Sequence, residues 1–216
     1  MPAYRSQAEA DIREPVIARL RELMPGARII NEIQNATHGP NRIDVLAVTR
    51  DRIAAVEIKS AKDKLDRLPA QIDAMRGCAH HVVAALHAKF FEVENWRDGL
   101  WAVPDWKATG GAVAWGFGFP APLHADCIAG RHLLRERWEK PMICPPEGAI
   151  NMLWREELRQ IVARRALARA TSKLTMPELI DVLRWHLTGA EVTREVCAAL
   201  RSRNCPEADA PVEDMA

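Results

Sequence analysis

The chain has 216 residues, with 30 Lys and Arg against 29 Asp and Glu and a formal net charge of +1. Its hydrophobic fraction of 48% can fill a packed core and excludes a wholly disordered chain. No apolar run approaches the roughly 18 residues that a membrane span needs, and no signal-peptide core follows Met1. We therefore expect a cytoplasmic protein without a membrane partner, whose five cysteines are reduced thiols.

The near-zero net charge hides two segments of opposite sign. Residues 150–203 carry ten basic and six acidic side chains, whereas residues 204–216 carry four acids and no base. The total charge is therefore a poor guide to whether the protein binds a polyanion.

The first 86 residues alternate between helical and strand-like patterns. Apolar side chains recur with a helical period over residues 6–24, where Pro15 should either kink the helix or stand near the start of its main part. The expected elements after it are a strand at 28–33, strands at 42–49 and 53–59, a turn and helix within 62–76 and a strand at 81–86. This gives the order α-β-β-β-α-β.

Weaker signals follow in the second half of the chain. We expect a short helix at 88–93, strands at 99–103 and 112–119, a helical piece at 131–138 and one long helix over 150–170. Capping boxes at Thr175 and Thr188 begin two more helices, which end near residues 187 and 201. The domain boundaries predicted from this pattern are an α/β core at 1–120, a Pro-rich connector at 121–148, a helical extension at 149–203 and an acidic, disordered tail at 204–216.

The two strands at 42–49 and 52–59 form a predicted hairpin with Arg50 and Asp51 at its tip. In that register Asp44 lies opposite Glu57, and Arg42 lies opposite Lys59. Opposed side chains share one face of the sheet, and Lys59 shares that face with Glu57 because side chains alternate along a strand.

Most other residues of this hairpin are apolar on both faces, which is typical of buried strands. Two opposed carboxylates there are unfavourable because of desolvation and mutual repulsion. A divalent cation between them removes both costs, and hard oxygen ligands suit Mg²⁺ or Mn²⁺. The alternative is that Asp44 and Lys59 are solvated strand-end charges and that Glu57 forms an ion pair with Lys59.

Asp44 followed by Glu57-Ile58-Lys59, in this order of elements, resembles the PD-(D/E)XK nuclease superfamily over residues 6–86. The resemblance implies a restriction-endonuclease-like αβββαβ core, a mixed sheet flanked by helices, with a C-terminal helical extension. Further sequence runs are similar to a small, poorly characterised bacterial and phage branch of this superfamily. Holliday-junction resolvases and virus-type replication-repair nucleases resemble it more distantly. The similar runs are residues 9–13, 42–44, 57–60, 65–72 and 153–158.

The resemblance also implies a role for each matching residue. Asp44 and Glu57 would be metal ligands with the Ile58 carbonyl, and Lys59 would be the catalytic lysine. Glu9 matches an acid that relatives bring to the metal from the first helix, with Glu14 and Glu32 as alternatives. Gln71 matches a glutamine of exonuclease-like relatives. The chain departs from the family in carrying Ile43 in place of the proline and Met75 where a tyrosine is frequent.

Basic and aromatic residues are the candidate nucleic-acid contacts. Arg42 stands at the entry to the Asp44 strand, and Arg165 and Arg169 are four apart in the long helix, as are Arg155 and Arg159. The alternative for the helix is a solvated face with Glu156 and Glu157 as ion-pair partners. The seven tryptophans are expected to be mostly core residues, with Trp96, Trp101 or Trp106 available to stack on bases.

These observations predict a Mg²⁺- or Mn²⁺-dependent nuclease that hydrolyses phosphodiester bonds in DNA. One alternative is a nucleic-acid-binding or scaffold protein that keeps the fold without turnover. Another is a nuclease directed at RNA, or a junction-specific enzyme that works as a homodimer. The intact set of two carboxylates and a lysine favours the first hypothesis.

Overall fold

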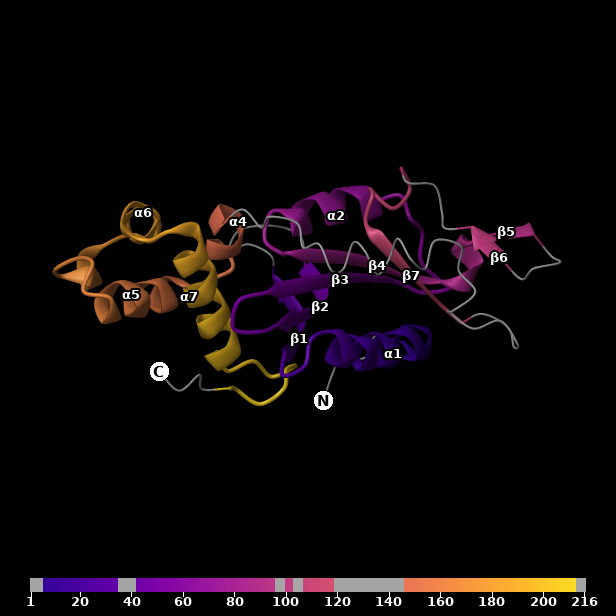
Figure 1. Cartoon of the computed structure of the whole chain (residues 1–216), viewed down its shortest axis with the longest axis horizontal. Helices are drawn as coiled ribbons and strands as arrows, with labels where there is room; N and C mark the ends of the chain where they lie inside the picture. The colour runs from indigo at the N-terminus through magenta and orange to yellow at the C-terminus, as the bar shows by residue number, and fades with distance from the viewer. Residues whose placement is uncertain (1–5, 35–41, 96–99, 103–106, 119–145, 213–216) are drawn as a thin grey trace.

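A five-stranded mixed β-sheet forms the centre of the protein in the computed structural model (Figure 1). The structure describes residues 6–34, 42–95, 100–102, 107–118 and 146–212. The strand order is β1-β2-β3-β4-β7, with bounds β1 Arg28–Gln34, β2 Arg42–Val48, β3 Ile53–Lys59, β4 His81–His87 and β7 Val113–Phe117. The α/β class and the order of the first six elements are therefore confirmed.

The hairpin of β2 and β3 has the predicted register. Val45 pairs with Val56 and Val48 with Ile53, so that opposed residue numbers add to the expected constant. The first three strands are antiparallel, whereas β3, β4 and β7 are parallel. The pairing of β2 with β3 ends at Val45 and Val56, which leaves Asp44 and Glu57 just beyond the last paired residues.

One helix covers each face of the sheet (Figure 1). Helix α1, Gln7–Leu23, begins after the capping residue Ser6 and continues through Pro15 as one element, so that its main part does not begin at the proline. It buries Ile12, Val16 and Leu20 against the sheet. Because only one helical face is apolar, burying it against a strand layer is what stabilises the helix.

Helix α2, Leu68–Arg76, covers the opposite face with a proline in its first turn, as the sequence predicts. Leu68, Ile72 and Met75 pack on that face together with buried side chains of the C-terminal helices. A short 3-10 helix η1, Ala88–Phe90, and a two-stranded sheet of β5, Glu92–Asn95, and β6, Leu100–Ala102, follow β4.

The predicted single helix over 150–170 is wrong. The chain instead forms α4, Pro146–Ile150, and α5, Arg155–Arg164, and then leaves the helical conformation. Ala166 and Ala170 have φ angles of 53° and 54°. This left-handed conformation is incompatible with a continuing right-handed helix. A 3-10 helix η3, Thr171–Lys173, completes this segment.

The two capping boxes do begin helices, α6 at Met176–His186 and α7 at Gly189–Ser202. Helix α7 lies against the first part of the sheet, where Arg201 Nη1 donates to the carbonyls of Gly26 and Val48, both at 3.0 Å. Arg28 donates in return to the Leu200 and Arg201 carbonyls. The helical extension thus shares one apolar core with the sheet.

The prediction of a disordered acidic tail is wrong for residues 204–212. Asn31 N donates to the Glu207 carbonyl at 2.8 Å, and Asp209 N donates to the Ile29 carbonyl at 2.9 Å. The tail therefore lies antiparallel along β1, with a bridge between Ile30 and Ala208, and covers this strand edge. Residues 121–145 of the connector predicted at 121–148 lie outside the described residues, and so does the helical piece expected at 131–138; residues 146–148 belong to α4.

Among the helices of the described residues, none has both the length and the apolar character needed to cross a membrane.

Candidate active site

A cavity of about 660 Å³ opens where β2 begins and β3 ends. Side chains from α1, β1, β2, β3, the loop after β3 and α2 meet in it. We call it the carboxylate cavity; its lining residues are Ser6, Glu9, Gln34, Arg42, Asp44, Glu57, Ile58, Lys59, Ser60, Lys62, Asp63, Arg67, Ala70 and Gln71. All the predicted metal ligands, the predicted catalytic residues and Arg42 are in this set.

Glu57, Lys59 and Gln71 form a hydrogen-bonded cluster on one wall of the cavity. Residues 57 and 59 share the face of β3 that α2 covers, so Gln71 from α2 can reach both. Lys59 Nζ donates to Glu57 Oε1 at 2.6 Å and to Gln71 Oε1 at 2.9 Å, and Gln71 Nε2 also donates to Glu57 Oε1. The Glu57–Lys59 ion pair expected in the non-functional alternative is thus present inside the cavity.

Glu57 is only 2% exposed, and its second carboxylate oxygen is unsatisfied. Among the residues that the structure describes, Glu57 Oε2 is buried and has no hydrogen-bond partner. A buried carboxylate oxygen without a partner is costly and rare in folded proteins. This atom therefore points to a bound cation or to a donor from outside the described part of the chain.

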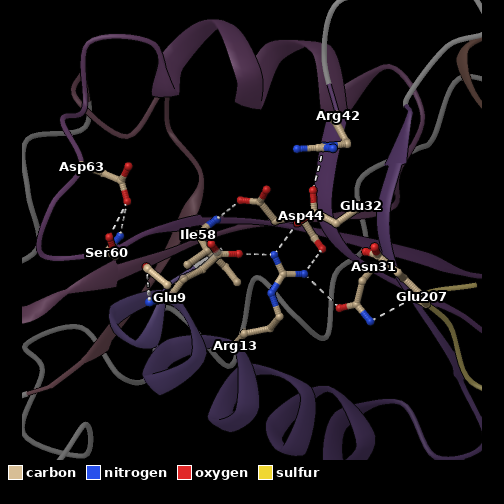
Figure 2. A network of polar contacts seen from close by, with 11 residues as sticks. Glu9, Arg13, Asn31, Glu32, Arg42, Asp44, Ile58, Ser60, Asp63 and Glu207 are labelled. Carbon is tan, nitrogen blue, oxygen red and sulfur yellow. Dashed lines mark hydrogen bonds and ion pairs between the residues drawn. The ribbon is translucent and has the colours of Figure 1, made fainter. Parts of the chain in front are cut away.

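Asp44 is held from two sides near the point where β2 and β3 separate. Its Oδ2 accepts from Ile58 N at 2.8 Å, and its backbone carbonyl accepts from Arg13 Nη1 at 2.6 Å. The first contact fixes the carboxylate and the second fixes the strand that carries it. Figure 2 shows both contacts, with Arg13 reaching up from α1 to the sheet.

Burial raises the pKa of both carboxyl groups. The pKa of Asp44 rises to about 6, chiefly because burial removes water from the carboxylate. The charge of Glu32 raises this pKa further, whereas the hydrogen bond from Ile58 N lowers it. The pKa of Glu57 rises to about 7 through desolvation and the charge of Asp44, against the opposing charge of Lys59. Each carboxylate is thus destabilised by its surroundings in a way that a cation would relieve.

The donor set fits a hard divalent cation. Asp44 and Glu57 supply carboxylate oxygens, and Ile58, the residue after Glu57 on β3, lines the same cavity and could add its backbone carbonyl. Mg²⁺ is commonly held by one or two carboxylates, with water and substrate phosphate completing its shell. Within the described ranges, no group of three or more His, Cys, Asp and Glu side chains could hold a metal. A cation here would therefore depend on ligands beyond these side chains.

Two of the three candidate accessory acids, Glu9 and Glu32, belong to a network around a buried arginine (Figure 2). Arg13, at 0% exposed, donates to Glu9 and Glu32, in each case at 2.5 Å, and Arg42 Nε lies 2.7 Å from the other oxygen of Glu32. Glu32 also has a φ of 56°, an uncommon conformation for a non-glycine residue. Glu9 lines the carboxylate cavity, whereas Glu14 and Glu32 do not.

The loop after β3 adds basic side chains that sequence reasoning missed. Lys62 and Arg67 line the cavity from exposed positions. Asp63 Oδ2 accepts from both the backbone and the hydroxyl of Ser60, and Lys89 donates to two carbonyls of this loop, those of Ala61 and Asp63. The available signal was the run of charges directly after the Glu57-Ile58-Lys59 motif.

The two arginines predicted from the C-terminal helix lie elsewhere. Arg165 follows the last residue of α5 and forms an ion pair with Glu195 at 2.6 Å. Arg169 lies in the irregular segment beyond it, so the two do not form a stripe along one helix. Arg159 pairs with Glu156, as the solvated-face alternative expects. Neither Arg165 nor Arg169 lines the carboxylate cavity.

One comparison with known proteins gives a match. A family model described as bacteriophage P4 protein cII matches residues 3–93. The matched range contains every residue that lines the carboxylate cavity and ends before the helical extension. No curated protein and no solved structure matches the chain.

Proposed function

We propose that this protein is a metal-dependent nuclease of the PD-(D/E)XK type, which hydrolyses phosphodiester bonds in DNA. The observation that carries the proposal is the meeting of half-buried Asp44 with buried Glu57 and Lys59 in one cavity, where Glu57 Oε2 has no partner among the described residues. A stable protein has little reason to bury two mutually repelling carboxylates unless they bind something.

The topology gives independent support. The elements follow the order α-β-β-β-α-β, and the mixed sheet places the acids where β2 and β3 stop pairing. This is the arrangement that the resemblance to the superfamily implies. The match to a phage protein family is compatible with a nucleic-acid function and does not define one.

Each residue has a distinct part in the proposed reaction. Asp44, Glu57 and the Ile58 carbonyl would hold Mg²⁺ or Mn²⁺, with Glu9 close by in the same cavity. When bound, the cation supplies positive charge to the phosphate and lowers the pKa of a water molecule. Lys59 carries the ammonium that stabilises negative charge developing on the phosphate oxygens. Gln71 holds Glu57 and Lys59 in fixed orientations.

Basic residues at the cavity rim favour a polyanionic substrate. Lys62 and Arg67 line the same cavity as the carboxylates from exposed positions. Arg42 lines it too, with 43% of its side chain exposed beside its ion-pair partner Glu32. These side chains can contact phosphates on either side of the reacting group, because the backbone of nucleic acid carries one charge per nucleotide.

The proposal is tested with a panel of end-labelled linear, nicked, branched and single-stranded DNA, and with RNA. Each substrate is incubated with Mg²⁺, Mn²⁺, Ca²⁺ or a chelator, and melting temperatures are recorded with each ion. We expect cleavage of at least one DNA with Mg²⁺ or Mn²⁺, and a higher melting temperature through mass action. The Asp44→Ala and Glu57→Ala variants should lose both effects.

The outcomes separate the competing functions. Cleavage of RNA alone would make the enzyme a ribonuclease, and a preference for branched DNA together with dimeric sedimentation would make it a junction enzyme. Tight binding of DNA without cleavage by any ion would support the scaffold alternative. The absence of cation binding even with DNA present would contradict a metal-dependent nuclease of any kind.

A further inference from the structure

A second cavity of about 420 Å³ adjoins the carboxylate cavity. Gln34 and Arg42 line both, so the two cavities meet at the ends of β1 and β2. We call the second one the Trp154 cavity; its lining residues are Ile30, Asn31, Glu32, Ile33, Gln34, Arg42, Met152, Trp154, Arg203, Cys205, Pro206 and Glu207. It brings together β1, the residue before α5 and the C-terminal tail.

Trp154 is an exposed aromatic side chain on a rigid support. It is 53% exposed, contrary to the expectation of a packing residue, whereas Trp115 is buried in the core. The Arg203 guanidinium lies 4.3 Å from the centroid of its ring. Arg203 is fixed in turn by an ion pair with Glu157 at 2.5 Å and by a hydrogen bond to the Met152 carbonyl.

We propose that the Trp154 cavity is a nucleobase subsite, in which one base of the strand held in the carboxylate cavity stacks on the indole. This inference rests on the proposed nuclease function and adds the position at which the enzyme grips the substrate strand. A flat aromatic surface that is already oriented loses little entropy on binding a base, and base–aromatic stacking works with any base. Arg42 stands where the strand passes from one cavity to the other.

The charges of this cavity suit a base and disfavour a phosphate. Glu207 Oε2 is buried and, among the described residues, has no hydrogen-bond partner. A carboxylate repels phosphate but accepts from the amino or ring N–H groups of a base. Arg203 cannot serve as a phosphate contact because Glu157 already neutralises its buried guanidinium. The volume is in the range of small-ligand pockets and admits a single base.

The test measures DNA binding by the full chain carrying Lys59→Ala, which blocks cleavage and keeps both carboxylates. Fluorescence anisotropy with Mg²⁺ gives the affinity for labelled oligonucleotides of the preferred substrate, each with one abasic position. Trp154→Ala and Trp154→Phe are added to this background. Trp185→Ala is the matched control, because Trp185 is 86% exposed on α6 and lines neither cavity.

We expect Trp154→Ala to weaken binding about tenfold, within the range that stacking of one base supports, and Trp154→Phe to retain most of the affinity. Removing one particular base from the oligonucleotide should lower its affinity for the Lys59→Ala parent by a similar factor. The same removal should lower its affinity for the Trp154→Ala variant little further. This non-additivity identifies a direct contact. The Trp185→Ala control should bind like the parent.

Two results would overturn the subsite. Equal affinity of Trp154→Ala and the parent would do so, and so would full additivity between Trp154→Ala and every abasic position. Far-ultraviolet circular dichroism checks that the variants are folded. If the parent itself binds no nucleic acid with Mg²⁺ or Mn²⁺, the proposed function fails and the subsite fails with it. If the parent binds DNA but Trp154 has no effect, the subsite alone is wrong.

Discussion

Glu57 combines burial, a negative charge and an oxygen without a partner. Lys59 and Gln71 both bind its Oε1, which leaves Oε2 buried and unsatisfied among the described residues. A protein that satisfied both oxygens of Glu57 by its own contacts would need a further donor beside Oε2, and the described residues do not provide one there. The closeness of Asp44 and Glu57 thus costs folding free energy when no cation is bound, and this cost is relieved when a cation binds between them.

This cost predicts a dependence of stability on pH in the absence of metal. The folded-state pKa of Glu57 is about 7 against an ordinary value of 4.5. A raised carboxyl pKa means that its contribution to stability is complete below the unfolded pKa and is lost as the pH rises through the folded pKa. The free energy of unfolding of the Glu57→Gln variant should therefore rise by about 1–3 kcal/mol relative to that of the parent as the pH increases from 4.5 to 8.

Urea unfolding of both proteins at several pH values, with a chelator present, measures this difference. Glu22→Gln is the control, because Glu22 is exposed at the end of α1. It shows what the removal of an exposed carboxylate alone does in the same assay. A constant difference for Glu57→Gln would show that Glu57 stays ionised in the folded protein at no cost.

Arg13 has a different task at the same site, because it keeps α1, β1 and β2 together. Its pKa is raised above the usual value: burial opposes the charge, but the hydrogen bonds and charges of Glu9 and Glu32 outweigh it. Arg13→Met keeps the volume and removes the cation. We expect a loss of about 3–5 kcal/mol in the free energy of unfolding, since two carboxylates lose their partner.

Arg21→Met is the comparison for this variant. Arg21 pairs with Asp209 at 2.8 Å on the surface, with half of its side chain exposed. Such a pair is worth about 0–1 kcal/mol. Equal losses of unfolding free energy for the two variants would mean that the ion pairs of Arg13 contribute no more than a surface pair. Partial recovery in Arg13→Met combined with Glu32→Gln would confirm that the unpaired acid causes the loss.

At the scale of elements, the C-terminal tail acts as a cover for the edge of β1. Ile29 N donates to Asp209 Oδ2 at 3.0 Å, Arg28 Nε donates to the Asp209 carbonyl, and Val212 N donates to the Arg201 carbonyl. A chain ending after Arg203 should lose at least about 2 kcal/mol of unfolding free energy, because several buried backbone groups lose their partners.

The control for this truncation ends after Val212 and keeps every described tail contact. It should unfold in urea like the full chain. The shorter chain should also self-associate in sedimentation experiments, since it exposes an unpaired strand edge. If both truncations behave like the full chain, the tail contributes nothing to the stability of β1.

The loop after β3 is the second element with a separate prediction. Lys62 and Arg67 line the carboxylate cavity, whereas Arg165 is engaged by Glu195 and Arg169 lies outside the cavity. Each lost phosphate contact flattens the slope of log affinity against log salt by roughly 0.7–0.9. Lys62→Ala with Arg67→Ala should therefore flatten the slope by about 1–2 in all.

The matched pair for this loop variant is Arg165→Ala with Arg169→Ala. Titration of labelled DNA at several salt concentrations should give this pair the slope of the parent. The opposite result, a flatter slope for the arginine pair alone, would move the binding surface to the segment after α5. It would also support the prediction from the sequence that this basic segment follows the phosphates.

For the whole molecule, the sequence was most informative where a pattern was local. Alternation along two short strands predicted the register of Val45 with Val56, and hence the meeting of Asp44 with Glu57. The capping boxes at Thr175 and Thr188 predicted two helix starts, because each motif satisfies its own backbone donors. Gln71 was reachable from the sequence only through a family resemblance.

Features that depend on distant contacts were out of reach. Arg13 reads as an ordinary solvated helix residue until Glu32 and Asp44 are placed beside it. The left-handed Ala166 carries no signal in its side chain, so the helical pattern seemed to continue past Arg164. The tail looked disordered by its composition, yet it is held mostly by backbone hydrogen bonds, which composition does not report.

The most direct test of a metal-dependent nuclease is single-turnover cleavage of its best DNA substrate with Mg²⁺ or Mn²⁺ by the parent, Lys59→Ala and Lys64→Ala. Lys64 is exposed in the loop after β3 and does not line the carboxylate cavity. We predict that Lys59→Ala cleaves at least about 100-fold more slowly at saturating DNA, while Lys64→Ala cleaves like the parent. Equal rates for Lys59→Ala and the parent would contradict the assignment of this cavity as the active site.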